Sequence, residues 1–320
     1  RWAEEQFNSE SVLFRESERL ELGRWLRSML HNRGETPSLG QAALCFVLIA
    51  TVQFFITIAL SVQSTELTFG FLVQSLFLSQ VVCILTPALL MTLLLTGSPR
   101  RTLLLYRRPR WTHLLAGLGL AIAVHPLAVQ LGHWISQLYP MSEETQASAK
   151  ALETVLFSDA RWWAPLLLIA VLPAFCEELA FRGFILSGLR HLGHKWWAIG
   201  LSAVAFGAVH LFVQQKMSAA VIGLLLGYLA VQTSSLWPCI LFHMTHNGLQ
   251  FGAYKAAAAV QERPDSVWAP LMGGSSPALY SVPVQLVCLA VAAAILWSLH
   301  RISYRRTKEE RLLEARERHE

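Results

Sequence analysis

The chain has 320 residues, of which 54% are hydrophobic and only 15% are charged. Soluble globular domains usually carry about 25% charged residues, and the charges here cluster between long apolar blocks, so the composition excludes an ordinary soluble enzyme. The net charge of +5 comes from arginines at the edges of those blocks, where they orient membrane segments, and it does not indicate nucleic-acid binding. We therefore expect an all-α, polytopic membrane protein.

Residues 1–40 are polar and we interpret them as a cytoplasmic linker. Apolar side chains from Leu20 to Leu30 recur at helical spacing, which predicts a short amphipathic helix on the membrane surface or, equally, an ordinary linker helix. The chain begins at Arg1 rather than Met, and no signal peptide precedes the first apolar block. We therefore expect it to be a piece of a longer protein or a chain trimmed at its N-terminus.

Apolar blocks near the length of about 20 residues that a spanning helix needs follow this linker. They predict a bundle of about eight transmembrane helices and a membrane-embedded domain over residues 41–300, followed by a charged, solvated helical tail over residues 301–320. The eight predicted spans are residues 41–62, 70–97, 111–138, 161–187, 196–213, 217–234, 236–254 and 280–300.

The connections between these blocks differ in charge. Arginine and lysine gather in the connections after the second and fourth blocks and in the tail after the eighth, whereas the segment 63–68 has no cation and the segment 139–160 has only Lys150. The positive-inside rule then places both ends of the chain in the cytoplasm, in agreement with an even number of spans. We expect an integral protein of a bacterial plasma (inner) membrane.

Ionisable and amide side chains are concentrated in three of the eight blocks, and the other blocks contribute little beyond His125 and His133. The fourth block holds Glu177, Glu178 and Arg182, the fifth holds His210, and the seventh holds His243, His246 and Asn247. A charge at the bilayer centre costs about 3 kcal/mol, so such groups usually face a polar interior and serve a function. Their occurrence together favours a shared site over isolated helix pairs.

The spacing of these residues suits hydrolysis. Glu178 and Arg182 are four residues apart and can pair on one helix face, while Glu177 lies about 100° around the helix. Two adjacent carboxylates in a low dielectric resist carrying two charges at once, so one is suited to take a proton from water. His243 and Asn247 share a face and could donate hydrogen bonds to a developing negative charge.

Two other interpretations use the same residues. A carboxylate with two histidines is a common zinc-binding set, so a zinc-dependent hydrolase is one alternative, although the chain has no HExxH motif. The other is a non-catalytic membrane subunit in which the polar residues join helices or let a substrate pass. A hydrolase needs a cavity within reach of Glu177, His210 and His243, whereas residues that join helices pair directly.

At these positions the sequence resembles the CPBP family (CAAX proteases and bacteriocin-processing enzymes), also called the ABI family. The family pattern is EExxxR, FxxxH and HxxxN/D on successive membrane helices. Here these are Glu177-Glu178 with Arg182, Phe206 with His210, and His243 with Asn247, within a core of about residues 115–255.

The resemblance implies an intramembrane endopeptidase related to the type II CAAX prenyl protease. In that family Glu177 would activate a water that His210 helps to hold, and His243 and Asn247 would stabilise the oxyanion. Glu178 and Arg182 would orient the site. The resemblance favours a mechanism without a metal or another cofactor, and a peptide or protein substrate that is membrane-associated or lipidated.

Residues 10–27 show a second resemblance, to the joint in bacterial proteins that fuse an ABC-type permease to a CPBP domain. It implies ABC transporter subunits as partners, besides membrane lipids.

One estimate opposes a shared site. A helix rises about 1.5 Å per residue, so counting from Arg161 and from Trp197 places Glu178 and His210 roughly 15 Å apart in depth. Side chains that far apart could not hold one water.

Overall fold

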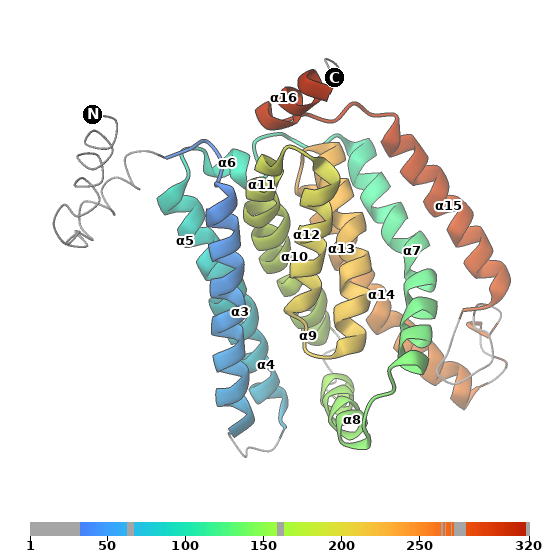
Figure 1. The fold of residues 1–320 in the computed structure, drawn as a ribbon. Coiled ribbons are helices and arrows are strands. Elements are labelled where there is room, and N and C mark those ends of the chain that lie inside the picture. The colour runs from blue at the N-terminus through green and yellow to red at the C-terminus, as the bar shows by residue number, and fades with distance from the viewer. Residues whose placement is uncertain are drawn as a thin grey trace, which may run out of the picture.

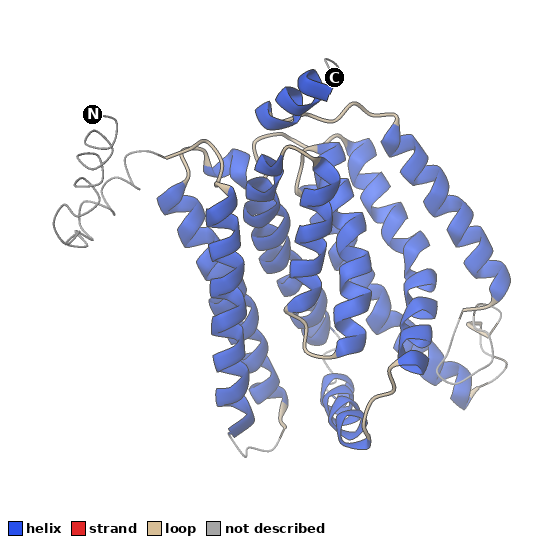
Figure 2. Cartoon of the chain, in the orientation of Figure 1, coloured by secondary structure: helices blue, strands red, loops and turns tan. Residues whose placement is uncertain are grey.

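The structure of the chain is a computed structural model that describes residues 33–62, 67–158, 163–263, 265, 267–269, 271 and 280–317. Over these residues the fold is a bundle of helices without a strand, apart from an isolated bridge between Gly34 and Thr96 (Figures 1 and 2). The all-α prediction is therefore confirmed. The predicted amphipathic helix and the permease-like stretch at residues 10–27 lie outside the described residues.

In chain order the described helices are α3 (Leu39–Val62), α4 (Phe69–Phe77), η1 (Leu78–Leu85), α5 (Thr86–Leu95), α6 (Pro99–Thr102), α7 (Trp111–Leu138), α8 (Glu143–Ser158), α9 (Trp163–Leu166), η2 (Leu167–Val171), α10 (Leu172–Glu177), η3 (Glu178–Ile185), α11 (Leu186–Leu189), η4 (Arg190–Leu192), α12 (Lys195–Ala208), α13 (Val213–Thr233), α14 (Trp237–Glu262), α15 (Val282–His300) and α16 (Lys308–Glu317). Two of the described spans are continuous stacks in which α turns alternate with π turns, and the second stack ends in the 3-10 turn η4.

Each of the eight predicted blocks contains a helix, but six of the described helices or helix stacks are long and apolar enough to cross a membrane. The stack from α9 to η4, Trp163–Leu192, is one of the six. The other two blocks correct the predicted count. Helix α12 has 14 residues, about 21 Å at 1.5 Å per residue, against a hydrocarbon core of about 30 Å. Helix α14 has 26 residues, but polar side chains such as His243, Asn247 and Lys255 interrupt its apolar sequence.

Two of the π segments, η1 and η2, run directly into a proline near the start of the next α-helix, Pro87 and Pro173. Proline has no N–H to give to the carbonyl four residues earlier, and its ring crowds that carbonyl. The turn before each proline widens to hydrogen bonds between residues five apart, the π pattern. A carbonyl inside the membrane that is freed in this way needs another donor.

Figure 1 shows α3, α4 and α5 on one side of the bundle, α10 to α13 in its middle, and α7, α14 and α15 on the other side. Helix α7 packs on α14 and α15, α12 packs on α13, and η1 packs on both α3 and α10. The connection predicted at residues 139–160 contains α8, a helix that the sequence reasoning missed. Its start has a local signal, because Glu143 and Glu144 occupy the first turn and Ser142 Oγ accepts from the Thr145 N–H at 3.3 Å.

Helix α16 lies across the end of the bundle from which α3 starts (Figure 1). The prediction of a solvated tail is wrong for one face of this helix, because Glu310 is only 3% exposed. Its carboxylate accepts two hydrogen bonds from the guanidinium of Arg190 in η4, at 3.1 and 2.8 Å. A paired arginine and glutamate thus hold the tail against the bundle.

Candidate active site

An open cavity of about 560 Å³ lies between α3, the α4–η1 stack and the junction of α12 with α13. Glu177 and His210 both line it, together with Gln53, Gln80 and Lys216 and a larger set of apolar side chains. Two of the residues predicted from the sequence, from different helices, therefore face one space. The apolar walls belong to helices that face the membrane, so the cavity combines a polar end with hydrophobic sides.

Glu177 is the last residue of α10 and is 5% exposed. Its Oε1 atom accepts a hydrogen bond from Gln80 Nε2 at 2.8 Å. Its Oε2 atom is buried and has no hydrogen-bond partner within the described part of the protein, although the residue lines the cavity. One carboxylate oxygen is thus fixed, and the other is buried without a hydrogen bond from the described residues, in a side chain that lines the cavity.

Glu178 and Arg182 form the ion pair that their spacing predicts, and both are fully buried. Arg182 donates from one guanidinium nitrogen to Glu178 Oε1 at 2.9 Å and from the other to the carbonyl oxygen of Gly223 at 3.3 Å. The same Glu178 oxygen lies 2.8 Å from His243 Nδ1. A carboxylate only accepts hydrogen bonds, so this contact assigns a proton to Nδ1 and leaves Nε2 facing elsewhere.

The other nitrogen of the His243 ring faces the second carboxylate. Its Nε2 atom lies 3.7 Å from Glu177 Oε2, which is too long for a direct hydrogen bond. The two atoms therefore face each other without a direct hydrogen bond. His243 therefore connects the two adjacent glutamates, one by a direct contact and one across a gap.

Phe206 joins the three motifs physically. The Arg182 guanidinium lies 4.0 Å from the centre of the Phe206 ring, a cation–π contact. The rings of His210 and His243 pack edge-on against Phe206, with centroids 5.0 and 5.9 Å away. This aromatic ring thus fixes the arginine and both imidazoles around one centre.

His210 lies just after α12 ends at Ala208, in a short connection rather than inside a span. Its Nδ1 atom is 2.9 Å from the carbonyl oxygen of Phe206, which assigns the proton to Nδ1 and leaves Nε2 as an acceptor in the neutral ring. The connection is tight, because a Cβ atom on Gly207 would lie 2.5 Å from the backbone oxygen of Lys216. Glycine at this position lets α12 and α13 approach closely and sets the place of His210.

The estimate of roughly 15 Å between the depths of Glu178 and His210 is wrong. Glu177 and His210 line the same cavity, and Phe206 contacts both His210 and the Arg182 that holds Glu178. The estimate assumed uninterrupted α-helices, whereas the fourth span contains two π segments and the fifth helix is short.

Asn247 and His246 have other surroundings in the described structure. Asn247 Nδ2 donates to the carbonyl oxygen of Ile169 at 3.0 Å, the carbonyl four residues before Pro173. The amide thus satisfies an acceptor that the proline leaves free. His246 is buried and packs edge-on against His125, with ring centroids 5.4 Å apart. Asn247, His246 and His243 are not among the residues that line the cavity, and His243 joins the site through its contacts with the two glutamates.

Gln80 is the site residue that sequence reasoning missed. It lies in η1, is 7% exposed, and contacts Glu177 from a part of the chain 97 residues away. Its signal in the sequence is weak: an amide inside an otherwise apolar span is expensive and requires a polar partner, but nothing in the sequence identifies that partner. Only the packing of η1 on α10 brings the two together.

The described residues contain no group of three or more His, Cys, Asp or Glu side chains arranged to hold a metal ion. Among the side chains of these types, His243 lies close to both glutamates of the site. His243 Nδ1 lies 2.8 Å from Glu178 Oε1, and His243 Nε2 lies 3.7 Å from Glu177 Oε2.

The comparison with protein families gives a match. The family described as type II CAAX prenyl endopeptidase Rce1-like matches residues 159–249, a segment that contains all six predicted site residues but not Gln80. No curated protein and no solved structure matches the sequence. The apolar helix bundle indicates an integral membrane protein, and residues 159–249 of this bundle are similar to the type II CAAX prenyl endopeptidase Rce1-like family, a family of proteases.

Proposed function

We propose that the chain hydrolyses a peptide bond inside the cavity, with Glu177 as the general base. Glu177 Oε2 takes a proton from a water while the water oxygen attacks the carbonyl carbon of the substrate. The C–N bond then breaks, and the proton passes to the leaving amine. The observation that carries this proposal is that Glu177 and His210 line one cavity while His243 Nε2 lies 3.7 Å from Glu177 Oε2.

The other site residues have supporting roles in this proposal. His210 Nε2 accepts a hydrogen bond from the attacking water, and His243 Nε2, when protonated, donates to the developing oxyanion. Glu178 fixes the His243 ring and balances its charge, as the carboxylate does in a Ser-His-Asp triad. Arg182 holds Glu178. Asn247, predicted as a second oxyanion donor, contributes through Ile169 to the shape of the helix that carries Glu177.

A non-catalytic membrane subunit is supported less well. Residues that only join helices would satisfy one another and leave no space between them. Here one oxygen of Glu177 has no hydrogen-bond partner among the described residues, and the side chain lines a cavity. We therefore favour the peptidase, and we propose a substrate that is a peptide or protein at the membrane.

The decisive experiment compares the wild type with Glu177→Gln, which keeps the shape of the side chain but removes the base. Proteomic comparison of membranes containing each protein identifies the cleaved substrate, and a peptide spanning its cleavage site then serves as the assay. Glu153→Gln, a glutamate of α8 outside the cavity, is the matched control. We expect cleavage to disappear only in Glu177→Gln, with unchanged thermal unfolding. Full cleavage by Glu177→Gln would refute the proposal.

A second measurement on the same protein distinguishes a zinc-dependent hydrolase from the metal-free mechanism. If Glu177 acts on water directly, purified protein retains its activity after prolonged treatment with a chelator and contains far less than one metal ion per chain. Loss of activity with the chelator, restored by zinc, would replace the metal-free mechanism with a zinc hydrolase.

We also propose that the end of the bundle carrying α16 faces the cytoplasm. Arg101, Arg190 and Arg306 lie at this end, near the ends of candidate spans, as the positive-inside rule requires. Cysteines introduced at exposed positions of α16 and α8 would report opposite accessibility to a membrane-impermeant thiol reagent in intact cells.

A further inference from the structure

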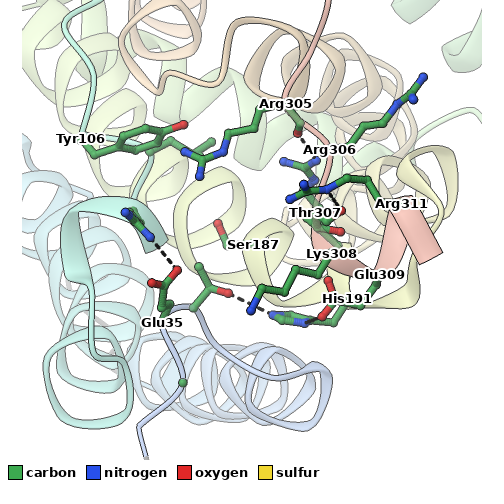
Figure 3. A pocket seen from close by; sticks show the side chains of 15 residues that line it. Glu35, Tyr106, Ser187, His191, Arg305, Arg306, Thr307, Lys308, Glu309 and Arg311 are labelled. Atoms are coloured by element: carbon green, nitrogen blue, oxygen red, sulfur yellow. Dashed lines mark hydrogen bonds and ion pairs between the residues drawn. The ribbon is translucent and has the colours of Figure 1, made fainter. Parts of the chain in front are cut away.

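A second pocket, of about 350 Å³, lies at the α16 end of the bundle (Figure 3). Its lining comes from four stretches next to the ends of candidate spans: residues 34–36 before α3, 101–106 after α5, 187–191 at the end of α11, and 305–311 after α15. It shares no lining residue with the cavity of Glu177. The pocket therefore lies at the depth of the lipid headgroups, outside the hydrocarbon core.

The lining of this pocket is strongly basic. Two of its side chains, Glu35 and Glu309, are acidic, and six are cations. Two of these cations are paired with glutamates outside the lining, Glu310 and Glu314. Even when Glu310 and Glu314 are counted with the lining, six cations stand against four carboxylates. The six cations are Arg101, Arg190, Arg305, Arg306, Lys308 and Arg311.

Three of these cations have no carboxylate partner among the residues that the structure describes: Arg305, Lys308 and Arg311. The guanidinium of Arg305 lies 5.7 Å from the centre of the Tyr106 ring, and Arg311 Nε donates to a backbone carbonyl at 3.3 Å. In Figure 3, Tyr106 and Arg305 lie along one side of the pocket, and Lys308 and His191 along the opposite side. Cationic groups thus stand on opposite sides of one space.

Both acidic side chains of the lining already have partners. Glu35 accepts from Arg101 at 2.6 Å, and Glu309 lies 2.9 Å from His191 Nδ1. Residues 307–309, at the start of α16, also line the pocket, and the N-terminal end of a helix carries a partial positive charge. The positive potential inside the pocket is therefore neutralised only in part by the protein itself.

We propose that this pocket binds a phosphate group. Arginine presents a planar fork of donors that matches phosphate oxygens, and lysine adds a point charge. The depth of the pocket favours the phosphate of an anionic phospholipid headgroup, since basic pockets at the ends of spans bind such headgroups. A soluble phosphate compound has the same chemistry, and the test distinguishes the two sources.

The experiment uses the intact chain purified in a mild detergent. Native mass spectrometry measures binding of short-chain phosphatidylglycerol, of inorganic phosphate, and of a short-chain diacylglycerol that lacks phosphate. The pocket variant is Arg305→Ala with Lys308→Ala, which leaves the Arg190–Glu310 pair that holds α16. The matched control is Arg108→Ala with Arg110→Ala, two exposed cations near the start of α7 that lie outside the lining.

Removing two cations near an anionic headgroup should lower the affinity of the pocket variant for phosphatidylglycerol by about 30-fold. The affinity of the control variant should stay within about twofold of the wild type. Loss for phosphatidylglycerol alone identifies a lipid headgroup as the ligand, and an equal loss for inorganic phosphate identifies a soluble source. Equal binding by both variants, or equal binding of diacylglycerol, overturns the proposal. If the double variant unfolds, the single variant Lys308→Gln gives the same test with about fivefold loss.

Discussion

Gln80 donates a hydrogen bond to Glu177 Oε1 at 2.8 Å from a helix outside the segment that matches the protease family. The contact joins η1 to the end of α10, and the other carboxylate oxygen of Glu177 has no hydrogen bond from the described residues. The proposed base thus depends on a residue that none of the three motifs contains.

We predict that Gln80→Met, which keeps the length of the side chain but removes its donor, lowers kcat with little change in KM. A hydrogen bond to a charged group contributes about 1.5–3 kcal/mol, so the expected loss in kcat is about 10- to 100-fold. Gln80→His, which restores a donor, should recover part of the activity.

The matched control for Gln80 is Gln53→Met. Gln53 lines the same cavity, but it donates to Ser79 Oγ at 2.9 Å rather than to Glu177. Equal losses in the Gln53 and Gln80 variants, or a purely KM effect, would mean that Gln80 shapes the cavity and does not position the base.

We predict that Arg182→Met strongly destabilises the protein, because it leaves Glu178 as a buried charge without its cation. Breaking a buried ion pair from one side costs about 3–5 kcal/mol. The double variant Glu178→Gln with Arg182→Met should recover much of the thermal stability in detergent but not the cleavage activity, since His243 then lacks its charged partner. A double variant no more stable than Arg182→Met would contradict this account.

We predict that Gly207→Ala impairs catalysis by moving His210. The added Cβ would lie 2.5 Å from the Lys216 backbone oxygen and 2.9 Å from Ala220 Cβ, so α12 and α13 must separate. A displacement of about 1 Å at a catalytic group can cost about 100-fold in rate. Gly200→Ala on the same helix meets no atom within 4 Å and should keep full activity. Wild-type turnover in Gly207→Ala would show that the position of His210 does not limit the reaction.

We predict that α16 detaches from the bundle in acid. Partial burial would raise the pKa of the Glu309 carboxyl, but hydrogen bonds from its own backbone N–H, from His191 and from Thr307 outweigh that effect, and its pKa lies below the ordinary 4.5. Because the folded pKa is depressed, the contribution of Glu309 is complete above pH 4.5 and is lost as the pH falls through the lower folded value. Hydrogen exchange in residues 308–317 should therefore accelerate in that window.

The control for this pH dependence is Glu309→Gln, in which the acid-induced step should be absent and exchange should be faster at neutral pH. An identical step in this variant would assign the acid sensitivity to another group.

Much of the fold followed from hydropathy, because the cost of exposing backbone to lipid fixes long apolar helices. The pair of Glu178 with Arg182 followed from helical spacing. Gln80 did not, since its partner depends on how η1 packs against α10, and sequence spacing carries no information across 97 residues. Helix α8 was missed because its amphipathic pattern is weak and its side chains are mostly exposed.

The different roles of His243 and Asn247 also became visible only in the structure. Four residues apart on α14, they share a face, but His243 meets the glutamates while Asn247 meets the carbonyl of Ile169. The Ile169 carbonyl oxygen, which Pro173 cannot supply with an N–H donor, decides the position of Asn247. A periodicity argument considers one helix at a time and does not find this contact.

The π turn η3 begins at Glu178 and contains Arg182. A turn that closes on the fifth residue takes up one residue more than an α turn, so a relative that had lost this widening would differ by a single deletion within "ELAFRGFI". Apolar neighbours give little information on where such a gap belongs. An alignment that ignores this deletion would misalign either Glu178 or Arg182. Two proteins with the same active site would then be assigned different site residues.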